Sequence, residues 1–226
     1  MEETIGVTGT DVPHIPQQRG DALLDTAVRY VEERHWDVLP GTWLEPADDG
    51  AERCSCAAPD CPAPGAHPAR TDWAAQATGS ASVARRLWGK QPRAAILLPT
   101  GRTFDVLDVS EAAGCLALAR MERMAVPLGP IICTPDRRML FLVLAGAAPK
   151  VPDLVRRLGM PPQSLDLVAR GEDDCVVAPP TRIGSRGAAQ WARRPTATNR
   201  WLPDVAELIS PLVYACGREA AESRGH

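Results

Sequence analysis

Three cysteines and one histidine fall inside one short stretch, and this cluster constrains the fold more than any other feature. The stretch covers residues 45–72, is rich in proline and glycine and offers few large apolar side chains, so burial alone cannot hold it together. Its potential ligands are Cys54, Cys56, Cys61 and His67. Thiolates and an imidazole at such spacings are typical of tetrahedral zinc sites. Four protein ligands leave no open position, so the sequence predicts a structural zinc that folds this insert.

The alternative reading of this stretch is a chance clustering, because the C-x-C spacing is tighter than that of most zinc sites.

The remaining cysteines lie in apolar runs and are predicted to be buried space-fillers; they are Cys115, Cys133, Cys175 and Cys216. The polar, acidic N-terminus lacks the pattern of a secretion signal, and no apolar run is long enough to cross a membrane. We therefore expect a cytoplasmic protein in which cysteines bind metal or stay reduced.

Hydrophobic periodicity indicates one mixed domain. The chain has 226 residues, of which 45% are hydrophobic, enough for a single core. We expect a flexible arm over residues 1–20 and one domain over 21–226. Predicted helices cover 21–34, with Asp21 as a cap, 80–90, 111–124, 151–159 and about 203–222. Predicted strands cover 35–40, 94–99, 104–109, 129–134, 139–144, 164–169 and 175–180, the last two paired with each other. Neighbouring strands that look hairpin-linked favour an α+β fold with helices packed on a sheet.

The charge pattern is uneven. The formal net charge is −3, so the whole molecule is not a basic clamp for nucleic acid. Between Cys175 and Pro203, however, no acid occurs and five arginines do. Because the planar guanidinium group pairs well with phosphate, this segment is a candidate phosphate-binding region. A solvated surface explains the same run equally well.

An acidic centre follows in the predicted strand 104–109. Two-metal phosphoryl transfer needs carboxylates that converge on two ions about 4 Å apart. Residues i and i+2 of a strand share a face, so Asp108 shares a face with Ser110 while Asp105 points the other way. The strand therefore offers one acid where two are needed, unless Glu111 faces the same site.

The ordered series of motifs resembles the N-terminal domain of bifunctional DNA primase/polymerases, the Prim-Pol family. The matching positions cover about residues 21–200 and are Trp36-x-Val38-x-Pro40, Cys54-x-Cys56, Cys61-Pro62-x-Pro64-Gly65-x-His67-Pro68, Trp88, Ile96 to Thr100-Gly101, Val106-Leu107-Asp108, Thr134-Pro135, Asp166, Val176 to Thr181 and Gln190-Trp191. The resemblance implies an RRM-like, palm-like sheet of mixed or antiparallel strands that carries metal-binding acids. It also implies a histidine that contacts the incoming nucleotide.

The departures from the family pattern fall on the chemistry. Asp108 matches the first metal-binding acid and Asp166 the later one, but Ser110 stands where the resemblance implies the second acid, and Leu140 where it implies the histidine. Serine cannot replace a carboxylate against Mg²⁺, and leucine cannot donate a hydrogen bond to a triphosphate. A bound Mg²⁺ or Mn²⁺ is therefore not expected, and the acids that remain are read as vestigial.

Three hypotheses remain open at this stage. The first is a Prim-Pol-like domain that has lost nucleotidyl transfer and binds nucleic acid, nucleotide or a protein partner, such as a replication protein. The second is an active primase/polymerase in which Glu111 completes the metal site and arginines hold phosphate, the candidates being Arg137, Arg138, Arg182 and Arg186. The third is a zinc-stabilised protein-interaction module without a nucleic-acid role.

Overall fold

The computed structural model describes residues 15–47, 50–196 and 201–224, and it alternates helices and short strands. The helices are α1 (Ile15–Arg34), α2 (Ala81–Lys90), α3 (Glu111–Arg123), α4 (Val151–Arg157) and α5 (Val205–Arg224). The strands are β1 (Leu39–Pro40), β2 (Leu44–Pro46), β3 (Glu52–Cys54), β4 (Ile96–Pro99), β5 (Asp105–Ser110), β6 (Ile131–Thr134), β7 (Arg138–Val143), β8 (Leu167–Arg170), β9 (Cys175–Val177) and β10 (Gln190–Arg193). All strand pairings among these residues are antiparallel.

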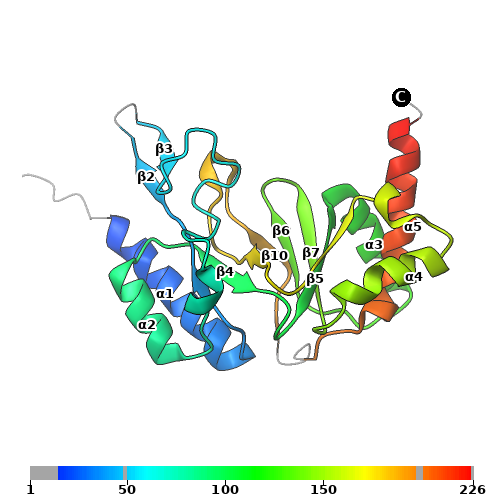
Figure 1. Cartoon of the computed structure of the whole chain (residues 1–226), viewed down its shortest axis with the longest axis horizontal. Helices are drawn as coiled ribbons and strands as arrows, with labels where there is room; N and C mark the ends of the chain where they lie inside the picture. The colour runs from blue at the N-terminus through cyan, green and yellow to red at the C-terminus, as the bar shows by residue number, and fades with distance from the viewer. Residues whose placement is uncertain (1–14, 48–49, 197–200, 225–226) are drawn as a thin grey trace, which may run out of the picture.

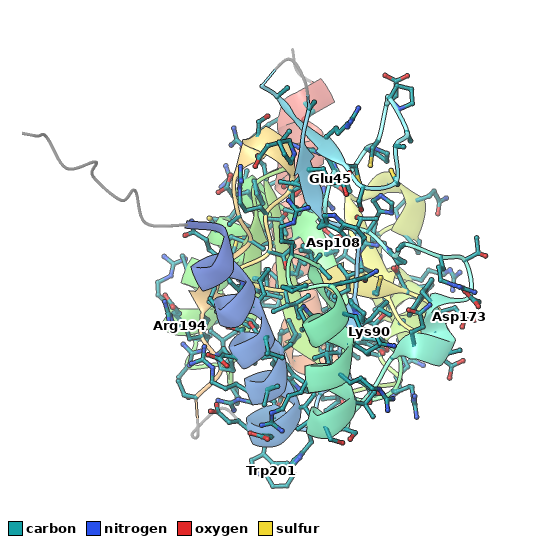
Figure 2. All side chains as sticks on the ribbon, turned by 90° about the vertical axis from the view of Figure 1, so that its left-hand side faces the viewer. Glu45, Lys90, Asp108, Asp173, Arg194 and Trp201 are labelled. Atoms are coloured by element: carbon teal, nitrogen blue, oxygen red, sulfur yellow. The ribbon has the colours of Figure 1, made fainter. Side chains whose placement is uncertain are left out.

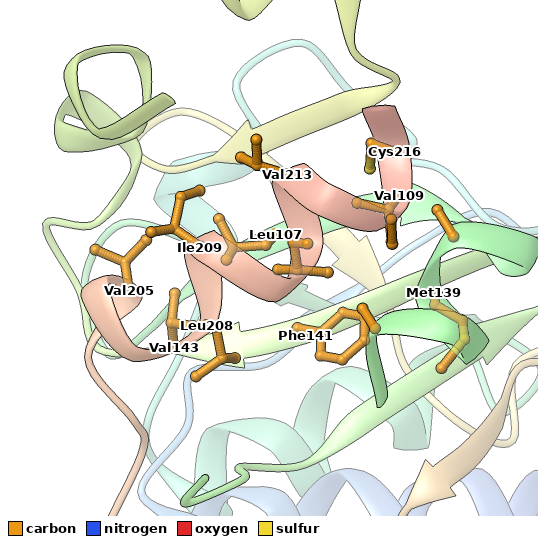
Figure 3. Close-up of a cluster of buried hydrophobic side chains, with 14 of the residues drawn as sticks. Leu107, Val109, Met139, Phe141, Val143, Val205, Leu208, Ile209, Val213 and Cys216 are labelled. Atoms are coloured by element: carbon orange, nitrogen blue, oxygen red, sulfur yellow. The ribbon is translucent and has the colours of Figure 1, made fainter. Parts of the chain in front are cut away.

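The larger sheet has five strands in the order β10-β6-β7-β5-β8. The side chains of its central strands alternate between the two faces of the sheet. Leu107 and Val109 of β5 and Phe141 of β7 point to the face covered by α3, α4 and α5 (Figure 3). Leu208 and Val213 of α5 close this core from the helix side. Because successive side chains of a strand point to opposite faces, every second residue of β5 and β7 lies on this face and the residues between them lie on the opposite face.

The opposite face of the five-stranded sheet packs toward a smaller sheet of order β1-β4-β9. Val106 and Leu142 from the larger sheet share a core with Ile96 and Val176 from the smaller one and with Trp88 of α2. Helices α1 and α2 lie beside each other on the far side of the smaller sheet (Figure 1). Every residue of β4 is buried, as expected for a short strand that has side chains packed on both faces.

The predicted helices and most of the predicted strands are confirmed, but the sequence did not predict β10, and several other details differ. Helix α1 begins at Ile15, so it includes residues that the sequence assigns to the flexible arm; residues 1–14 lie outside the described part of the chain. The insert 45–72 is less irregular than expected, because β2 and β3 form a short hairpin in it. Cys115 is exposed rather than buried, and Cys133 and Cys175 are only half-buried.

The predicted pairing between strands 164–169 and 175–180 is wrong. Strand β8 pairs with β5 in the larger sheet, whereas β9 pairs with β4 in the smaller one. The turn between them is tied to the residue that follows β4, because the Thr100 hydroxyl donates to the Gly171 carbonyl at 2.6 Å and the Thr100 amide donates to Asp174 at 2.9 Å. The chain therefore crosses between the sheets at this turn. The alternation of apolar residues sets the face of a strand but not its neighbour.

The fold is a mixed α+β arrangement with a Cys/His-containing insert, as the sequence predicts. Within the described residues, none of the helices combines the length and the apolar character that crossing a bilayer requires.

Candidate functional site

Asp108 is the centre of a network of charges on the face of β5 that points away from α3, α4 and α5. Its side chain is only 3% exposed. In the sheet it stands opposite Leu140 of β7 and Val168 of β8, so its diagonal neighbours on the same face are Arg138 and Arg170. Both arginines reach it: Arg138 Nε donates to Oδ1 at 2.8 Å, and Arg170 Nη2 and Nε donate to Oδ2 at 2.6 and 2.8 Å. Both carboxylate oxygens of Asp108 are therefore bound by guanidinium groups.

Two further acids extend the network outward. Arg138 forms a two-pronged contact with Asp166, with Nη1 to Oδ2 at 2.5 Å and Nη2 to Oδ1 at 3.0 Å. Arg170 also donates to Asp174 at 3.0 Å. The network is thus a chain of alternating charges, Asp166–Arg138–Asp108–Arg170–Asp174, in which each arginine bridges two carboxylates. Paired guanidinium–carboxylate contacts of this kind are the stronger class of charged hydrogen bonds.

The electrostatics match this geometry. Hydrogen bonds to Asp166 raise the pKa of Arg138 above its usual range. Burial lowers this pKa, but the hydrogen bond to Asp108 and the charges of both aspartates raise it further, so the pKa stays high. Burial disfavours the charge on Arg170, but its hydrogen bond with Asp108 and the charges of Asp108 and Asp174 exceed that effect and raise its pKa too. Both arginines stay charged and fixed at neutral pH.

Ser110 has a structural role at the end of β5. Its hydroxyl accepts a hydrogen bond from the Ala113 amide at 3.1 Å and so caps the first turn of α3. The same hydroxyl donates to Glu219 of α5 at 2.5 Å. Arg138 is the direct cross-strand partner of Ser110. A short side chain at position 110 therefore lies beside the arginine that holds both Asp108 and Asp166.

Glu111, the acid that the second hypothesis needs, is ion-paired elsewhere. Its carboxylate lies 3.2 Å from Nε of Arg137, a residue whose left-handed backbone (φ 62°) makes the tight turn between β6 and β7. Glu111 is not among the residues that line the cleft next to Asp108. Leu140, at the position where the resemblance implies a histidine, is buried at the floor of that cleft.

The cleft in front of Asp108 lies between the two sheets and the Cys/His-containing insert, and its volume is about 340 Å³. The larger sheet contributes Asp108, Arg138 and Leu140, the smaller sheet contributes β9, and the insert contributes Ala66 and His67. Its charged lining consists of four aspartates and two arginines, namely Asp108, Asp136, Asp173, Asp174, Arg138 and Arg170. The wall of this cleft is therefore more acidic than basic.

The Cys/His cluster forms a compact four-ligand set. The ligand atoms of Cys54, Cys56, Cys61 and His67 all lie within 4.8 Å of one another. His67 Nδ1 lies 2.8 Å from the Pro68 carbonyl, which orients Nε2 toward Cys54 Sγ, 3.4 Å away. In zinc sites the outer ring nitrogen is typically held by such an acceptor. The set fits one tetrahedral Zn²⁺ ion with no open position.

The thiol chemistry of the cluster agrees with metal binding. Burial disfavours the ionised form of Cys54, but hydrogen bonds from the backbone amides of Cys56 and Gly65 outweigh it and lower the pKa of Cys54 to about 6. The thiolate is the form that binds metal. Burial and the neighbouring thiols raise the pKa of Cys61 to about 11, and a bound cation would favour its thiolate form.

Two of the arginines that the sequence offers as phosphate-binding candidates tie the insert to the body of the protein. Arg182 forms a two-pronged ion pair with Glu52 of β3, at 2.7 and 2.9 Å. Arg186 donates to the Pro62 carbonyl at 2.5 Å, and the Gly184 amide between them donates to Pro64. These contacts give Arg182 and Arg186 a structural use, and their phosphate-binding role stays a prediction.

Sequence reasoning missed Arg170 and Asp174. Arg170 ends β8 and Asp174 follows the turn that crosses between the sheets. Neither residue belongs to a motif that the resemblance identifies. Only the antiparallel register of β5 with β8 brings Arg170 diagonally next to Asp108, and that register is not readable from the residue pattern.

Comparison with known proteins gives one match. The family model described as "Bifunctional DNA primase/polymerase, N-terminal" matches residues 27–206, well over half of the chain. No curated protein and no solved structure matches the sequence. The matched range includes both sheets, the Cys/His insert and the Asp108 network.

Proposed function

The chain belongs to the bifunctional DNA primase/polymerase N-terminal family, the Prim-Pol family, and from this premise we propose that it is a Prim-Pol domain without efficient nucleotidyl transfer. In this proposal the domain acts by binding nucleic acid, nucleotide or a protein partner. We place it in the cytoplasm, because a reducing compartment keeps cysteines as thiols instead of disulfides.

The observation that carries the proposal is the bonding of the metal-site acids to arginine. Both oxygens of Asp108 and both oxygens of Asp166 accept hydrogen bonds from guanidinium groups. A pair of Mg²⁺ ions would need the same oxygens, because Mg²⁺ takes hard anionic ligands in near-octahedral geometry. Metal binding would therefore have to displace Arg138 from two carboxylates and Arg170 from one.

The energetics oppose that displacement. Arg138 and Arg170 are only 24% and 32% exposed, and a partly buried cation that loses its counter-charge is costly, on the order of several kcal/mol. Ser110, which stands where the resemblance implies an acid, makes metal binding still less favourable. Its hydroxyl supplies no charge and is already bonded to Ala113 and Glu219. A rearranged active site that uses Glu111 receives no support from the pairing of Glu111 with Arg137.

The connectivity of the larger sheet supports a palm-like role for it. From β5 to β8 the elements follow the order β5-α3-β6-β7-α4-β8, and the strands lie in the order β6-β7-β5-β8. We propose that this is the RRM-like palm of the family, because it has the β-α-β-β-α-β order of split βαβ folds. Asp108 then lies on the sheet face opposite α3 and α5, the face on which RRM sheets bind nucleic acid.

We propose that zinc holds one wall of the cleft. His67 is both a member of the four-ligand set and a lining residue of the cleft. A bound Zn²⁺ ion would fix the loop from Cys54 to His67 and with it the shape of the cleft. Zinc would have no part in chemistry, because its four protein ligands complete its coordination.

The charge of the cleft favours a second candidate for its occupant. Four aspartates against two arginines make the cleft repel phosphate, which disfavours nucleic acid at this position. A basic segment of a partner protein would complement the same wall. Partner binding in the cleft is therefore the alternative that the lining supports.

Primer-synthesis and primer-extension assays on zinc-loaded protein test the proposal. With Mg²⁺ or Mn²⁺ and all four dNTPs, we expect incorporation no greater than that of an Asp108→Ala variant. Incorporation that depends on Asp108 would refute the loss of nucleotidyl transfer and would support the rearranged active site instead.

A further inference from the structure

A second pocket lies away from the cleft, where α1, the Pro179–Pro180 segment and the end of β10 meet. Its volume is about 310 Å³ and it shares no lining residue with the cleft. Figure 2 shows Arg194 of this pocket on the flank beside α1, whereas Asp173 of the cleft lies on the other flank. The volume is at the lower end of the range, roughly 300–1,000 Å³, that small-molecule sites occupy.

The pocket is a cationic site on an anionic protein. Three arginines, Arg29, Arg34 and Arg194, and one acid, Glu33, line it, while the whole chain has a net charge of −3. The side chains of Arg29 and Arg194 are exposed, and both charges act on the Tyr30 hydroxyl at the pocket wall. A local excess of positive charge of this kind attracts anions, phosphate in particular, from solution.

One buried donor of Arg34 lacks an acceptor within the part of the chain that the structure describes. Its Nη1 donates to the Thr196 carbonyl at 2.8 Å. Its Nε is buried and has no hydrogen-bond partner among the described residues. Buried donors are paired in nearly all folded proteins, so an unpaired nitrogen on a pocket-lining side chain indicates a missing acceptor. A phosphate oxygen would be such an acceptor.

The pocket also has an aromatic wall. Trp191 of β10 is half-buried and lines it together with Tyr30 of α1. The two rings meet edge to face with centroids 6.1 Å apart, and Trp191 also contacts Trp36 at 6.3 Å. The Tyr30 hydroxyl donates to the Pro179 carbonyl at 2.7 Å and fixes the ring. Core packing accounts for the inner side of Trp191, and its solvent-accessible part shares the pocket with the three arginines.

We propose that this pocket binds a nucleotide unit, with its base stacked on Trp191 and its phosphate held by Arg29, Arg34 and Arg194. An aromatic platform beside arginines is the arrangement that binds single-stranded nucleic acid without reading sequence. The unit comes either as a free nucleotide or as part of a strand. Since β10 is the edge strand of its sheet, a strand has room to continue past it. This binding is independent of the Asp108 network and of any nucleotidyl transfer.

Fluorescence anisotropy with a 5′-fluorescein-labelled dT20 oligonucleotide tests the pocket, and unlabelled dTMP as a competitor distinguishes the two sources. The Arg29→Glu/Arg194→Glu double variant should weaken binding about tenfold or more and flatten the salt dependence, because it reverses charges at the phosphate. Arg156→Glu/Arg157→Glu, the same total charge change at two exposed positions of α4, should leave binding close to that of the wild type. Competition by dTMP at submillimolar concentration would assign the pocket to free nucleotides, and its failure would assign it to strands.

A photo-cross-link keeps the test independent of protein stability. An oligonucleotide that contains 5-iodo-deoxyuridine should cross-link the wild-type protein at the peptide carrying Trp191 or Tyr30. Cross-links that map to the cleft, equal binding by the double variant and the wild type, or no binding of either dT20 or dTMP at low salt would each overturn the proposal. The primer assays do not depend on these results, so the two proposals fail separately.

Discussion

Arg138 donates from Nε to Oδ1 of Asp108 at 2.8 Å, although the two residues come from different strands and are not direct cross-strand partners. The contact is diagonal: Arg138 stands opposite Ser110, two positions along β5 from Asp108. An acid at position 110 would compete for this arginine. The short serine leaves Arg138 bonded to Asp108 and Asp166. In our proposal, the serine at position 110 and the pairing of these two acids with arginine belong to one arrangement.

Asp108→Asn should destabilise the fold. The substitution removes the charge that both Arg138 and Arg170 share in a part-buried network, and breaking such a network from one side costs about 3 kcal/mol. Urea unfolding at pH 7 measures the free energy of unfolding. Asp153→Asn, in the exposed pair with Arg156, is the matched control and should change stability by less than about 0.5 kcal/mol. A loss below about 1 kcal/mol for Asp108→Asn would mean that the network contributes little.

Zinc should bind in a ratio of one ion per chain and should depend on Cys61. Cys61→Ser removes one of the four ligands, so we expect loss of the metal in elemental analysis and rapid proteolytic cleavage within residues 45–72. Cys115→Ser, at an exposed thiol outside the cluster, should retain full zinc content. Equal zinc content in the two variants would rule out the proposed ligand set.

Gly114→Ala should lower stability even though alanine favours helices. A Cβ atom at this position in α3 would lie 2.6 Å from Sδ and 2.7 Å from Cβ of Met139. Overpacking of this kind costs about 1–3 kcal/mol, more than the gain of about 1 kcal/mol in helix propensity. At Gly89 of α2 a Cβ meets no atom within 4 Å, so Gly89→Ala should stabilise the protein by about 0.5–1 kcal/mol. Opposite signs in urea unfolding check this contrast; a stabilising Gly114→Ala would contradict it.

Stability should fall at alkaline pH. Burial raises the pKa of Cys175, of Cys216 and of Tyr30 each to about 12. The unfolded chain ionises these groups first, from about pH 9 for the thiols. Their contribution is therefore complete below about pH 9 and is lost as pH rises toward 12, by about 1.4 kcal/mol per pH unit for each group.

Urea unfolding between pH 7 and pH 11 measures this slope. Cys216→Ala should make the slope shallower by one group, whereas Cys115→Ala, at an exposed thiol, should leave it unchanged. A pH dependence that is identical in the wild type and in Cys216→Ala would show that Cys216 is not protected from ionisation.

Local signals predicted much of this molecule. The parity of β5 correctly placed Asp105 and Asp108 on opposite faces, and Asp105 Oδ2 accepts from the Ala148 amide at 2.8 Å. The hydroxyl of Ser110 instead bonds to Ala113 of α3 and Glu219 of α5. The cysteine spacing correctly identified a compact ligand set, because its members are close in sequence. The helix periodicity located α2 and α3 within a residue or so of their observed ends.

Features that depend on long-range register were not predictable. Arg170 becomes a partner of Asp108 only through the pairing of β5 with β8, which are separated by α3, β6, β7 and α4. The split of β8 and β9 between two sheets has the same cause, since apolar alternation does not identify a neighbouring strand. Arg138 was expected to meet phosphate because its type suits phosphate, but it lies between two carboxylates of its own chain.

Manganese binding tests the central claim most directly. Electron paramagnetic resonance of zinc-loaded protein titrated with Mn²⁺ counts bound ions, because bound Mn²⁺ loses its free-ion signal. Since Arg138 and Arg170 hold the oxygens of Asp108 and Asp166, we predict that the wild type binds no more Mn²⁺ than the Asp108→Asn variant at millimolar concentrations. Two ions per chain that disappear in Asp108→Asn would contradict the replacement of the metal pair by arginine.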